Sequence, residues 1–348
     1  MTTASDVAQL AGVSTMTVSR VISNSGYVKE TTRDRVEMAI SQLGYVPNAL
    51  ARQLRSKRTK TLALVLSDIT NPYFTTIAHG VEELASHRGF TVILGNTNES
   101  GREEARYLRL LVERQVDGVI LVPARSSGSS LRLLETHHIP VVVVDRRVAA
   151  REIDGVTSDS VAGARALTEH LLALGHRRIA ILTGRRAIST ATDRVAGCRR
   201  ALKEAGLALD EALIHYGIFN FGSGNQADGY RMARDVLEAG PPRPTAIFAA
   251  NNFIAYGAIR ALHEAGLRVP EDMSVVAFDD LPPEWVPDPF LTVAVQPAYE
   301  IGRTAATMLL DRVSGERCGP AEQVVFPVEV RIRRSSAPPP APPAPGLN

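Results

Sequence analysis

Residues 4–24 read ASDVAQLAGVSTMTVSRVISN, and this stretch decides the fold of the N-terminal part of the chain. Apolar residues recur at helical spacing on both sides of a break at residues 11–14. The spacing places Val7, Leu10 and Ala11 on one face of a first helix and predicts a second helix with its own apolar face. Two short helices joined by a turn that contains glycine are typical of a helix-turn-helix, whose second helix lies in the DNA major groove.

Cap signals mark the ends of both helices. Thr3 and Asp6 form the pattern of a capping box at the start of the first helix. Gly12 tolerates the positive φ that a tight helix exit needs, and Ser14 is a good N-cap for the second helix. The outward side of that helix then carries side chains that can reach bases and phosphates, namely Thr15, Met16, Thr17, Ser19 and Arg20. The alternative is a helical hairpin that only packs.

The following segment completes a small domain. Apolar residues at i, i+3, i+4 and i+7 predict a third amphipathic helix over residues 31–43, namely Val36, Ala39, Ile40 and Leu43. Asn48 can cap a further helix of about two turns, which is too short to be stable alone in water and needs a partner.

From Thr61 onward, strands and helices alternate. Two series of apolar runs predict strands over residues 61–66, 90–94, 118–122 and 141–144, and over residues 178–182, 245–249 and 275–278. Helices are predicted between them, for example over residues 77–87 and 161–174. Near-continuous Val, Ile and Leu indicates parallel sheets buried on both faces, and two series indicate two doubly wound lobes. Residues 291–296 are expected to cross back to the first lobe, a helix over 301–313 to pack there, and residues 324–331 to return to the second.

This chain resembles the LacI/GalR family of bacterial transcriptional repressors over about residues 3–334. The matching pieces in the first 60 residues are Asp6-Val7-Ala8, Ala11-Gly12-Val13-Ser14, Thr17-Val18-Ser19-Arg20-Val21, Thr32-Arg33-x-Arg35-Val36, Leu43-Gly44-Tyr45-x-Pro47-Asn48 and Ala51-Arg52-x-Leu54. Further on they are Asp68-Ile69-Thr70-Asn71-Pro72-Tyr73-Phe74, Val116-Asp117-Gly118-Val119-Ile120, Leu174-Gly175-His176 and Gln296-Pro297. Two positions depart: the family usually has Asn where this chain has Ser23, and Asn-Asp where it reads Asn251-Asn252.

The resemblance implies an α + α/β protein with a helix-turn-helix head and two doubly wound parallel lobes like type I periplasmic binding proteins. The expected parts are the DNA-binding head over 1–46, a hinge helix and linker over 47–60, and an effector-binding and dimerisation core over 61–334. Lobe 1 is expected at about 61–160 and 293–320, and lobe 2 at about 161–292 and 321–334. Residues 335–348 are rich in proline and poor in large apolar side chains, which predicts a disordered tail.

The resemblance also implies DNA contacts and an effector site. In the head, Thr15, Met16 and Arg20 are expected to meet base edges, and Ser14, Thr17 and Ser19 are expected to meet phosphates. In the hinge the implied DNA-binding residues are Asn48, Ala51 and Leu54. Leu54 is expected to enter a central minor-groove step; the alternative is packing against a second hinge.

Ligands of open α/β sheets bind beyond the carboxyl ends of the strands. The residues there that match the family's effector positions are Ser67, Tyr73, Phe74, Asp145, Arg194, Phe219, Asn251 and Asp279. Carboxylates, an amide, a guanidinium and aromatic rings suit a polyol. Strand-end Asp residues can instead cap helices or pair with Arg, and Trp285 can line the pocket mouth or simply pack.

Charge and cysteine usage agree with this interpretation. Residues 1–60 hold nine basic and four acidic side chains, a net charge of +5, whereas the whole chain carries only +2. A basic head suits a polyanionic partner. Cys198 and Cys318 are far apart and lack metal-ligand spacing, which indicates a reducing compartment and free thiols. No apolar run approaches 18 residues and the N-terminus is polar, so we expect a cytoplasmic protein with no membrane span.

Rival functions have weaker support. Gly222 and Gly224 hint at a glycine-rich loop of an enzyme, but there is no P-loop, nucleophile elbow or metal-ligand spacing, so no cofactor or metal is expected. A sugar-binding protein independent of DNA would not need the head. The prediction is therefore a homodimeric repressor of palindromic operators whose DNA affinity is set by a sugar between the lobes. A phosphosugar, favoured by Arg146-Arg147 and Arg185-Arg186, or a nucleoside or purine is the alternative effector.

Overall fold

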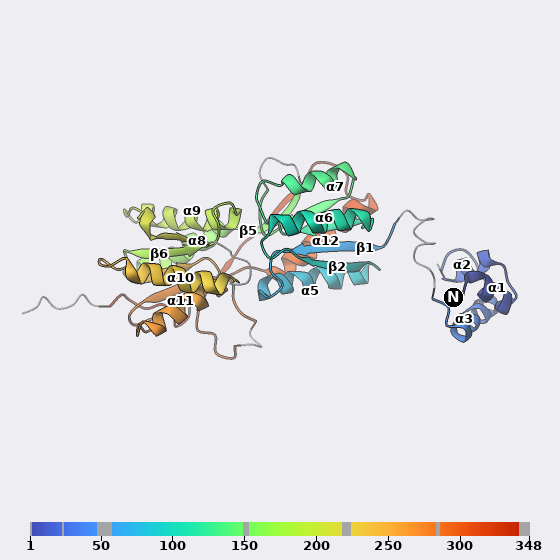
Figure 1. The fold of residues 1–348 in the computed structure, drawn as a ribbon, viewed down its shortest axis with the longest axis horizontal. Helices are drawn as coiled ribbons and strands as arrows, with labels where there is room; N and C mark the ends of the chain where they lie inside the picture. The colour runs from blue at the N-terminus through green and yellow to red at the C-terminus, as the bar shows by residue number, and fades with distance from the viewer. Residues whose placement is uncertain are drawn as a thin grey trace, which may run out of the picture. The chain divides into compact units, whose positions relative to one another are not determined.

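The computed structural model describes residues 2–22, 24–46, 58–148, 153–217, 224–282 and 286–340. It divides into two compact units, Met1–Thr59 and Lys60–Asn348 (Figure 1). The hinge predictions at Asn48, Ala51 and Leu54 lie outside the described residues, as do Ser23, Phe219 and Trp285.

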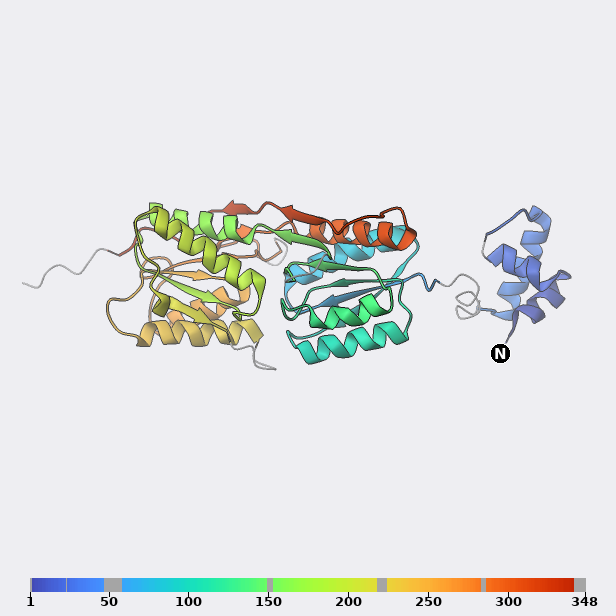
Figure 2. The same ribbon diagram turned by 90° about the horizontal axis from the view of Figure 1, so that it is seen from above.

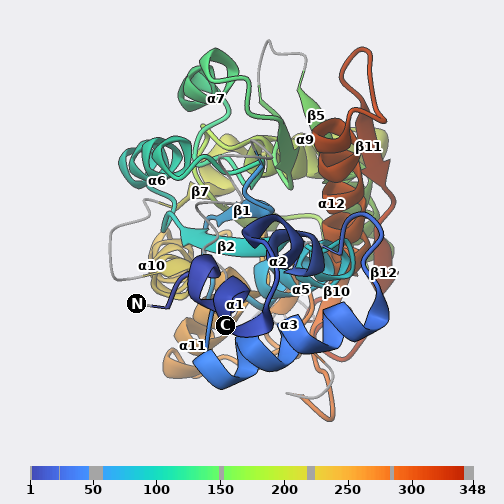
Figure 3. The ribbon, with the colours of Figure 1, turned by 90° about the vertical axis from the view of Figure 1, so that its right-hand side faces the viewer.

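The first unit is the predicted helix-turn-helix followed by a third helix (Figure 3). Its elements are α1 (Ala4–Ala11), α2 (Thr15–Ile22) and α3 (Glu30–Leu43). The capping box of α1 is present, because Thr3 Oγ1 accepts from the Asp6 amide at 3.3 Å and Asp6 Oδ2 accepts from the Thr3 amide at 2.7 Å. Gly12 ends α1 at φ +64°, and Ser14 Oγ accepts from the Thr17 amide at 3.2 Å at the start of α2.

The three helices enclose a small apolar core. Its buried members come from all three helices: Val7, Ala8, Ala11, Val18, Val21, Val36 and Ala39. The expectation that Leu10 shares this face was wrong, since its side chain is 51% exposed and Ala8 is buried instead. The buried face of α1 therefore consists of Val7, Ala8 and Ala11.

The second unit holds two six-stranded sheets, one in each lobe. The first-lobe sheet has the order β11-β5-β4-β3-β1-β2, with β1 (Thr61–Leu66), β2 (Thr91–Asn96), β3 (Gly118–Leu121), β4 (Val141–Val144), β5 (Asp154–Ser158) and β11 (Gln323–Phe326). The second-lobe sheet has the order β12-β10-β9-β8-β6-β7, with β6 (Ile179–Thr183), β7 (Ile214–Tyr216), β8 (Ala246–Ala249), β9 (Ser274–Phe278), β10 (Thr292–Val295) and β12 (Glu329–Arg331). Among the described residues, every strand pairing is parallel except that of β10 with β12.

Helices cover both faces of each sheet. The first lobe carries α5 (Pro72–His87), α6 (Gly101–Glu113), the 3-10 turn η1 (Ser129–Leu131), α7 (Arg132–Thr136) and α12 (Ala298–Ser314). The second carries α8 (Ser160–Ala173), α9 (Ser189–Glu204), the 3-10 turn η2 (Glu211–Leu213), α10 (Gly224–Glu238) and α11 (Asn252–Glu264). No helix among the described residues is long and apolar enough to span a bilayer.

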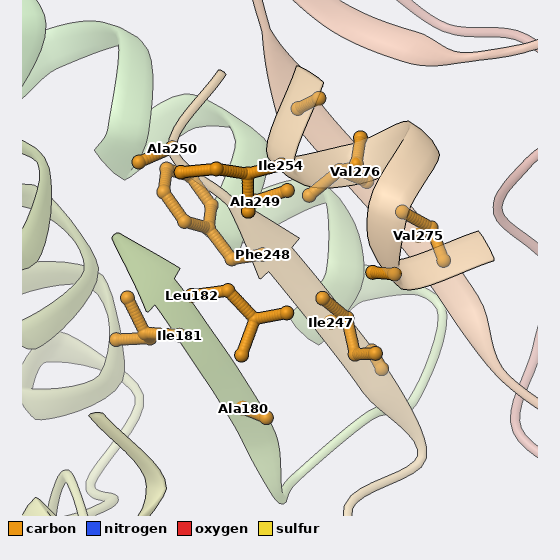
Figure 4. Packing of buried hydrophobic residues seen from close by; sticks show 14 of the residues in the cluster. Ala180, Ile181, Leu182, Ile247, Phe248, Ala249, Ala250, Ile254, Val275 and Val276 are labelled. Atoms are coloured by element: carbon orange, nitrogen blue, oxygen red, sulfur yellow. The ribbon is translucent and has the colours of Figure 1, made fainter. Parts of the chain in front are cut away.

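Burial on both faces explains the near-continuous apolar strands. In β1, Leu62, Leu64 and Leu66 belong to the core beneath α5 and α12, whereas Ala63 and Val65 belong to the core on the opposite face. The second lobe repeats this pattern: β6, β8 and β9 contribute buried side chains that pack together (Figure 4). This packing fixes where the strand ends lie, and the candidate site is built there.

The chain crosses between the lobes three times, and two of the expected crossings were placed wrongly (Figure 2). β10 was expected to return to the first lobe, but it pairs with β9 in the second, with Thr292 opposite Val276. The crossing follows Val295, and α12 then packs in the first lobe as expected. β11 pairs with β5 in the first lobe, so only β12 returns to the second. An apolar run predicts a strand but does not say which of two sheets it joins.

The start of the predicted disordered tail is folded. Ser335 is fully buried between the beginnings of β9 and β10. Its amide donates to Phe290 O at 3.1 Å, its hydroxyl donates to Val275 O at 2.5 Å, and the Thr292 amide donates to its hydroxyl oxygen at 2.8 Å. We refer to residues 335–340 as the C-terminal strap. Its attachment is polar, which explains why apolar content did not predict it.

A buried histidine continues this attachment. Nε2 of His176 lies 2.9 Å from Ala337 O and therefore carries the proton, because a carbonyl oxygen only accepts. Nδ1 then accepts from the Thr245 hydroxyl at 2.8 Å. Ser274 Oγ joins the same cluster, since it accepts from the Ala337 amide at 3.0 Å. The strap thus ties the starts of three second-lobe strands together.

Removal of residues 335–348 is expected to lower the free energy of unfolding by about 3 kcal/mol or more, because several buried donors and acceptors lose partners at about 0.5–1.5 kcal/mol each. Removal of residues 341–348 alone keeps the strap and serves as the control. Urea unfolding followed by circular dichroism measures both changes. Equal midpoints for the two truncated proteins would contradict the structural role of the strap.

Candidate functional site

Six of the eight predicted effector residues line one pocket between the lobes of the second unit. Tyr73 and Phe74 come from the start of α5, and Asp145 follows β4. The second lobe contributes Arg194 from α9, Asn251 before α11 and Asp279 after β9. Other pocket-lining residues were not predicted: Asn71, Glu99, Thr183, Gly184, Ile188, Thr190, Ala191 and Ala250.

The two pocket aspartates occupy equivalent places in the two lobes. Asp145 and Asp279 each follow the last residue of a central strand, and both have left-handed backbones, with φ of +67° and +64°. Such a conformation is unusual for residues other than glycine and tends to occur at functional sites. The turn directs both buried carboxyl groups into the pocket.

Arg194 is held by contacts within the second lobe that leave part of its guanidinium group unpaired among the described residues. Its guanidinium lies 3.9 Å from the centroid of the Phe278 ring, and Nη1 donates to the Ala250 carbonyl oxygen. Its buried Nε has no hydrogen-bond partner among the described residues, and neither has the buried Thr183 Oγ1 in the same pocket. Because buried polar groups are normally paired, these two groups point to a hydrogen-bonding ligand.

A hydrogen-bond chain joins the lobes beside the pocket. The Tyr73 hydroxyl donates to Gln296 Oε1 at 3.4 Å, and Gln296 Nε2 donates to Asp279 Oδ1 at 2.6 Å. Gln296 directly follows β10, where the chain crosses between lobes. Gln296 matched the family pattern but was not predicted as a site residue. Its position where the chain crosses between the lobes could have identified it.

Arg146 lines the pocket, and Ser67 lies beside it outside the lining. Arg146 is buried and donates to both carboxylate oxygens of Glu99, and its Nε lies 3.3 Å from Asp145 Oδ2. Ser67 Oγ accepts from its Nη2 at 3.5 Å, so Ser67 supports Arg146 and does not line the pocket. Arg147 forms an interlobe ion pair with Asp193 at 2.6 Å.

Burial changes the protonation of the pocket. It raises the pKa of Asp279 to about 6, although the Arg194 charge and the Gln296 hydrogen bond oppose the increase. Burial also raises the pKa of Asp145, against the charges of Arg146 and Arg194. The pKa of Tyr73 lies well above its ordinary value, mainly because the ring is buried and secondly because Asp145 is close.

Replacement of Asp279 by Asn is expected to stabilise the protein at neutral pH. The folded state retains the Asp279 proton up to about pH 6, whereas the unfolded chain releases it near 3.8, so ionisation at pH 7 costs about 3 kcal/mol. Asp279→Asn should raise the free energy of unfolding by about 2–3 kcal/mol at pH 7.5. This increase in the free energy of unfolding should become smaller as the pH falls through 6 and should vanish below about pH 4. Denaturant unfolding at pH 4 and 7.5 measures this; an equal change at both pH values would contradict the assignment.

The enclosed space is small. The pocket has a cavity volume of about 60 Å³, whereas ligand pockets usually offer about 300–1,000 Å³. A ligand therefore requires the lobes or the lining side chains to move apart. Asn251 also caps α11, since its Oδ1 accepts from the Ile254 amide at 2.8 Å. The alternative that a strand-end Asp pairs with Arg applies to Asp145, which lies 3.3 Å from Arg146 Nε and also lines the pocket. Among the described residues, no cluster of His, Cys, Asp or Glu can hold a metal ion.

The predicted DNA-facing residues of the head lie on α2 and at its N-cap, from Ser14 to Arg20 in the last turn. Ser14, Thr15, Met16 and Arg20 are exposed, and Met16 is 56% exposed. Thr17 and Ser19 are half-buried, and the Thr17 hydroxyl lies 3.0 Å from Ser14 Oγ.

Two further head features were not predicted. Tyr27 is 87% exposed, and Arg33 donates to Asn24 Oδ1 at 3.0 Å. The position of Tyr27, an aromatic residue in a polar loop, could have predicted this exposed side chain.

Comparisons with known proteins match both units. Residues 59–330 match the model of the periplasmic binding proteins and sugar binding domain of the LacI family, and residues 3–48 match the model of bacterial regulatory proteins, lacI family. The transcriptional repressor PurR of Erwinia tasmaniensis is 37% identical over 339 residues, which cover 97% of each chain.

Solved structures agree. A complex of the transcriptional regulator CelR with cellobiose has 35% identity and a TM-score of 0.72 over 96% of this chain and 100% of that one. The Lac repressor dimer bound to operator and the anti-inducer ONPF has 28% identity and a TM-score of 0.82 over 97% of this chain and 99% of that one.

Proposed function

Because this chain belongs to the LacI family of bacterial regulatory proteins, we propose that it is a homodimeric cytoplasmic repressor whose operator affinity is set by a neutral sugar between its lobes. As a family member it is a DNA-binding transcriptional regulator with an effector-binding core, and it is not an enzyme. Our proposal adds to this the effector residues, the class of effector, the dimer and the cellular location.

The charge of the pocket is the observation that supports a neutral sugar. Glu99, Asp145 and Asp279 contribute carboxyl groups, against the two guanidinium groups of Arg146 and Arg194. Hydroxyl groups of a sugar can donate to the carboxylates and accept from the Arg194 Nε. An additional phosphate would bring negative charge next to Asp145 and Asp279, which are already difficult to ionise.

The alternatives fit less well. Arg146 was a candidate for holding a phosphosugar, but Glu99 and Asp145 already pair with it. The Arg186 guanidinium carbon lies 4.3 Å from the centroid of the Tyr216 ring, on which it stacks. Arg186 is not among the pocket-lining residues. A purine needs an aromatic face to stack on, and the two aromatic rings that line the pocket, Tyr73 and Phe74, are both only 6% exposed.

Ligand screening tests the effector class. The wild-type protein is titrated calorimetrically with three sets of compounds: neutral pentoses and hexoses, their phosphate esters, and purines with their nucleosides. We expect saturable binding within the neutral set and weaker binding of each corresponding phosphate. A phosphate ester that binds more tightly than its parent sugar, or binding confined to purines, would contradict the proposal.

The mechanism requires a ligand that distinguishes two arrangements of the lobes. A ligand shifts an equilibrium only by its difference in affinity for the two states. Tyr73 and Asp145 belong to one lobe, and Arg194 and Asp279 to the other, so a bridging ligand changes the free energy of lobe closure. The hinge residues Asn48, Ala51 and Leu54 are proposed to pass this change to the DNA.

Dimerisation is proposed through the edge of the first-lobe sheet. One recognition helix reads only a half-site, so a palindromic operator needs two heads. β2 is an edge strand, and its Ile93 and Leu94 are 41% and 48% exposed. Proteins normally cover or charge such an apolar edge, and a second copy of this chain would cover it.

Charged residues at this edge are expected to produce monomers. Ile93→Lys combined with Leu94→Lys places two positive charges in the proposed interface, where the twofold symmetry brings like charges together. Light scattering after size exclusion should give half the mass of the wild type, with operator binding lost at concentrations that saturate the wild type. Ile332→Lys, at an exposed second-lobe position, is the control. A double variant that stays dimeric would place the interface elsewhere.

A further inference from the structure

Direct contacts between the lobes gather at the start of α9, beside the effector pocket. Ser126, in the loop after β3, accepts from the Ser189 amide through its Oγ at 3.1 Å. The Arg147 amide donates to Ser189 Oγ at 2.9 Å, and the Arg147 guanidinium pairs with Asp193 at 2.6 Å. We call these four residues the interlobe latch. They lie outside the lining of the pocket.

The helix α9 begins without a cap of its own. Its N-cap residue, Ile188, makes no side-chain cap hydrogen bond. The first amides of a helix have no partner within the helix, so each needs an acceptor from elsewhere. Ser126 of the first lobe is the acceptor for the Ser189 amide. The start of α9 is therefore completed by the opposite lobe, and it loses this partner when the lobes separate.

The same turns of α9 also form a wall of the effector pocket. The lining residues from this segment are Ile188, Thr190, Ala191 and Arg194. Ser189 and Asp193 alternate with them along the helix and contact the first lobe instead. Movement of this segment away from the first lobe would therefore break the latch and widen the pocket at the same time.

The first-lobe side of the latch is held within its own lobe. Buried Glu104 accepts from the Ala124 amide at 2.5 Å, and its other carboxylate oxygen accepts from the Ser130 hydroxyl. These two bonds restrain the loop that carries Ser126 on both sides of that residue. Ser126 is thus a fixed acceptor, against which the start of α9 opens and closes.

We propose that the interlobe latch holds the effector pocket closed and must open before a sugar can enter. The closed pocket has a volume of only about 60 Å³, so a ligand needs a wider arrangement than the one that the latch stabilises. Contacts that exist only in the closed arrangement lower the apparent affinity for such a ligand. This inference rests on the proposed effector pocket. It makes Ser126 a positioning residue that acts through α9 and does not touch the sugar.

Hydrogen–deuterium exchange of the ligand-free protein tests whether the latch opens as a unit. Ser126→Ala removes the acceptor of the Ser189 amide but leaves Ser189 Oγ available to the Arg147 amide. If the contacts break together, the Arg147 amide should exchange about threefold faster or more in this variant. Ser126→Thr keeps the hydroxyl and should restore the wild-type rate. Ser127→Ala, at the exposed neighbouring serine, is the control.

Calorimetry with the neutral pentoses and hexoses tests the effect on binding. Ser126→Ala combined with Ser189→Ala removes both interlobe hydrogen bonds and leaves every pocket-lining side chain in place. For the sugar that binds the wild type, the double variant should bind about fivefold more tightly or better, because each lost hydrogen bond changes an equilibrium by roughly 2- to 12-fold. The Arg147–Asp193 ion pair is kept, since an exposed pair contributes little by itself. Ser126→Thr and Ser127→Ala should bind like the wild type.

Three results would overturn the inference. Unchanged exchange of the Arg147 amide in Ser126→Ala would mean that the contacts open independently. Equal sugar affinity in the double variant would mean that the pocket widens without separation of the lobes at the latch. Weaker affinity would place the latch in the ligand-bound arrangement. If no sugar binds even the wild type, the proposed effector class is contradicted, whereas the exchange rates still decide whether the latch opens as a unit.

Discussion

Replacement of Thr15 by Gln together with Met16 by Ala is expected to change which operator the protein prefers. Both side chains are exposed at the start of α2, the helix that we propose enters the major groove. Each altered base contact is worth about 1–3 kcal/mol of discrimination, which corresponds to roughly 5- to 150-fold in relative affinity. Selection from a randomised operator library, followed by sequencing of bound DNA, measures the preference of both proteins.

Ser19→Ala is the control for this experiment. A residue that meets phosphate carries no sequence information, so its loss should weaken binding by a similar factor for all operators. If the double variant and the wild type rank the library identically, Thr15 and Met16 do not read bases.

Arg194→Ala is expected to keep operator binding and to lose most of its response to effector. The contacts of Arg194 are local to the second lobe, namely the Ala250 carbonyl and the Phe278 ring. Loss of a charge-assisted hydrogen bond to a buried ligand costs about 1.5–3 kcal/mol, so the effective concentration should rise roughly 10- to 150-fold. Titration of the operator complex with the most tightly bound compound of the ligand screen measures the shift.

Arg147→Ala provides a matched arginine in the same cleft. Its guanidinium is exposed and pairs with Asp193, outside the pocket lining, so its removal should change the response far less. Unchanged effector affinity in both Arg194→Ala and Asp279→Asn would place the effector elsewhere.

Local sequence signals predicted the first unit well. Helix starts and stops depend on neighbouring residues, and the Thr3–Asp6 capping box, Gly12 and Ser14 all act within one turn of where they stand. Leu10 was misplaced because the choice between Leu10 and Ala8 depends on the space left by other helices, which periodicity does not contain.

Long-range pairing limited prediction in the second unit. β5 was missed because its residues Asp154–Ser158 look polar, although Asp154 is buried in an ion pair with Arg312 at 2.7 Å. The C-terminal strap was missed for a similar reason, since Ser335 and Ala337 are held by hydrogen bonds to the starts of β9 and β10.

The candidate site was predicted largely because the topology rule is simple. Parallel strands end at one edge, and the residues after β4 and β9 are Asp145 and Asp279. Gln296 was missed because its role comes from two partners in different lobes, at positions 73 and 279. The pairing of Arg146 with Glu99 likewise joins residues from different strand ends, and only the fold shows that this arginine is already neutralised.

The affinity for a selected operator, measured by fluorescence anisotropy with and without a saturating sugar that binds the core, tests most directly whether the effector pocket controls DNA binding. The account predicts at least 10³-fold preference for that operator over unrelated DNA, and a 5- to 150-fold change in operator Kd on addition of the ligand. By linkage, operator must change the affinity for the ligand by the same factor. An operator Kd that is the same with the ligand-binding site empty and saturated would contradict the claim that this pocket controls DNA binding.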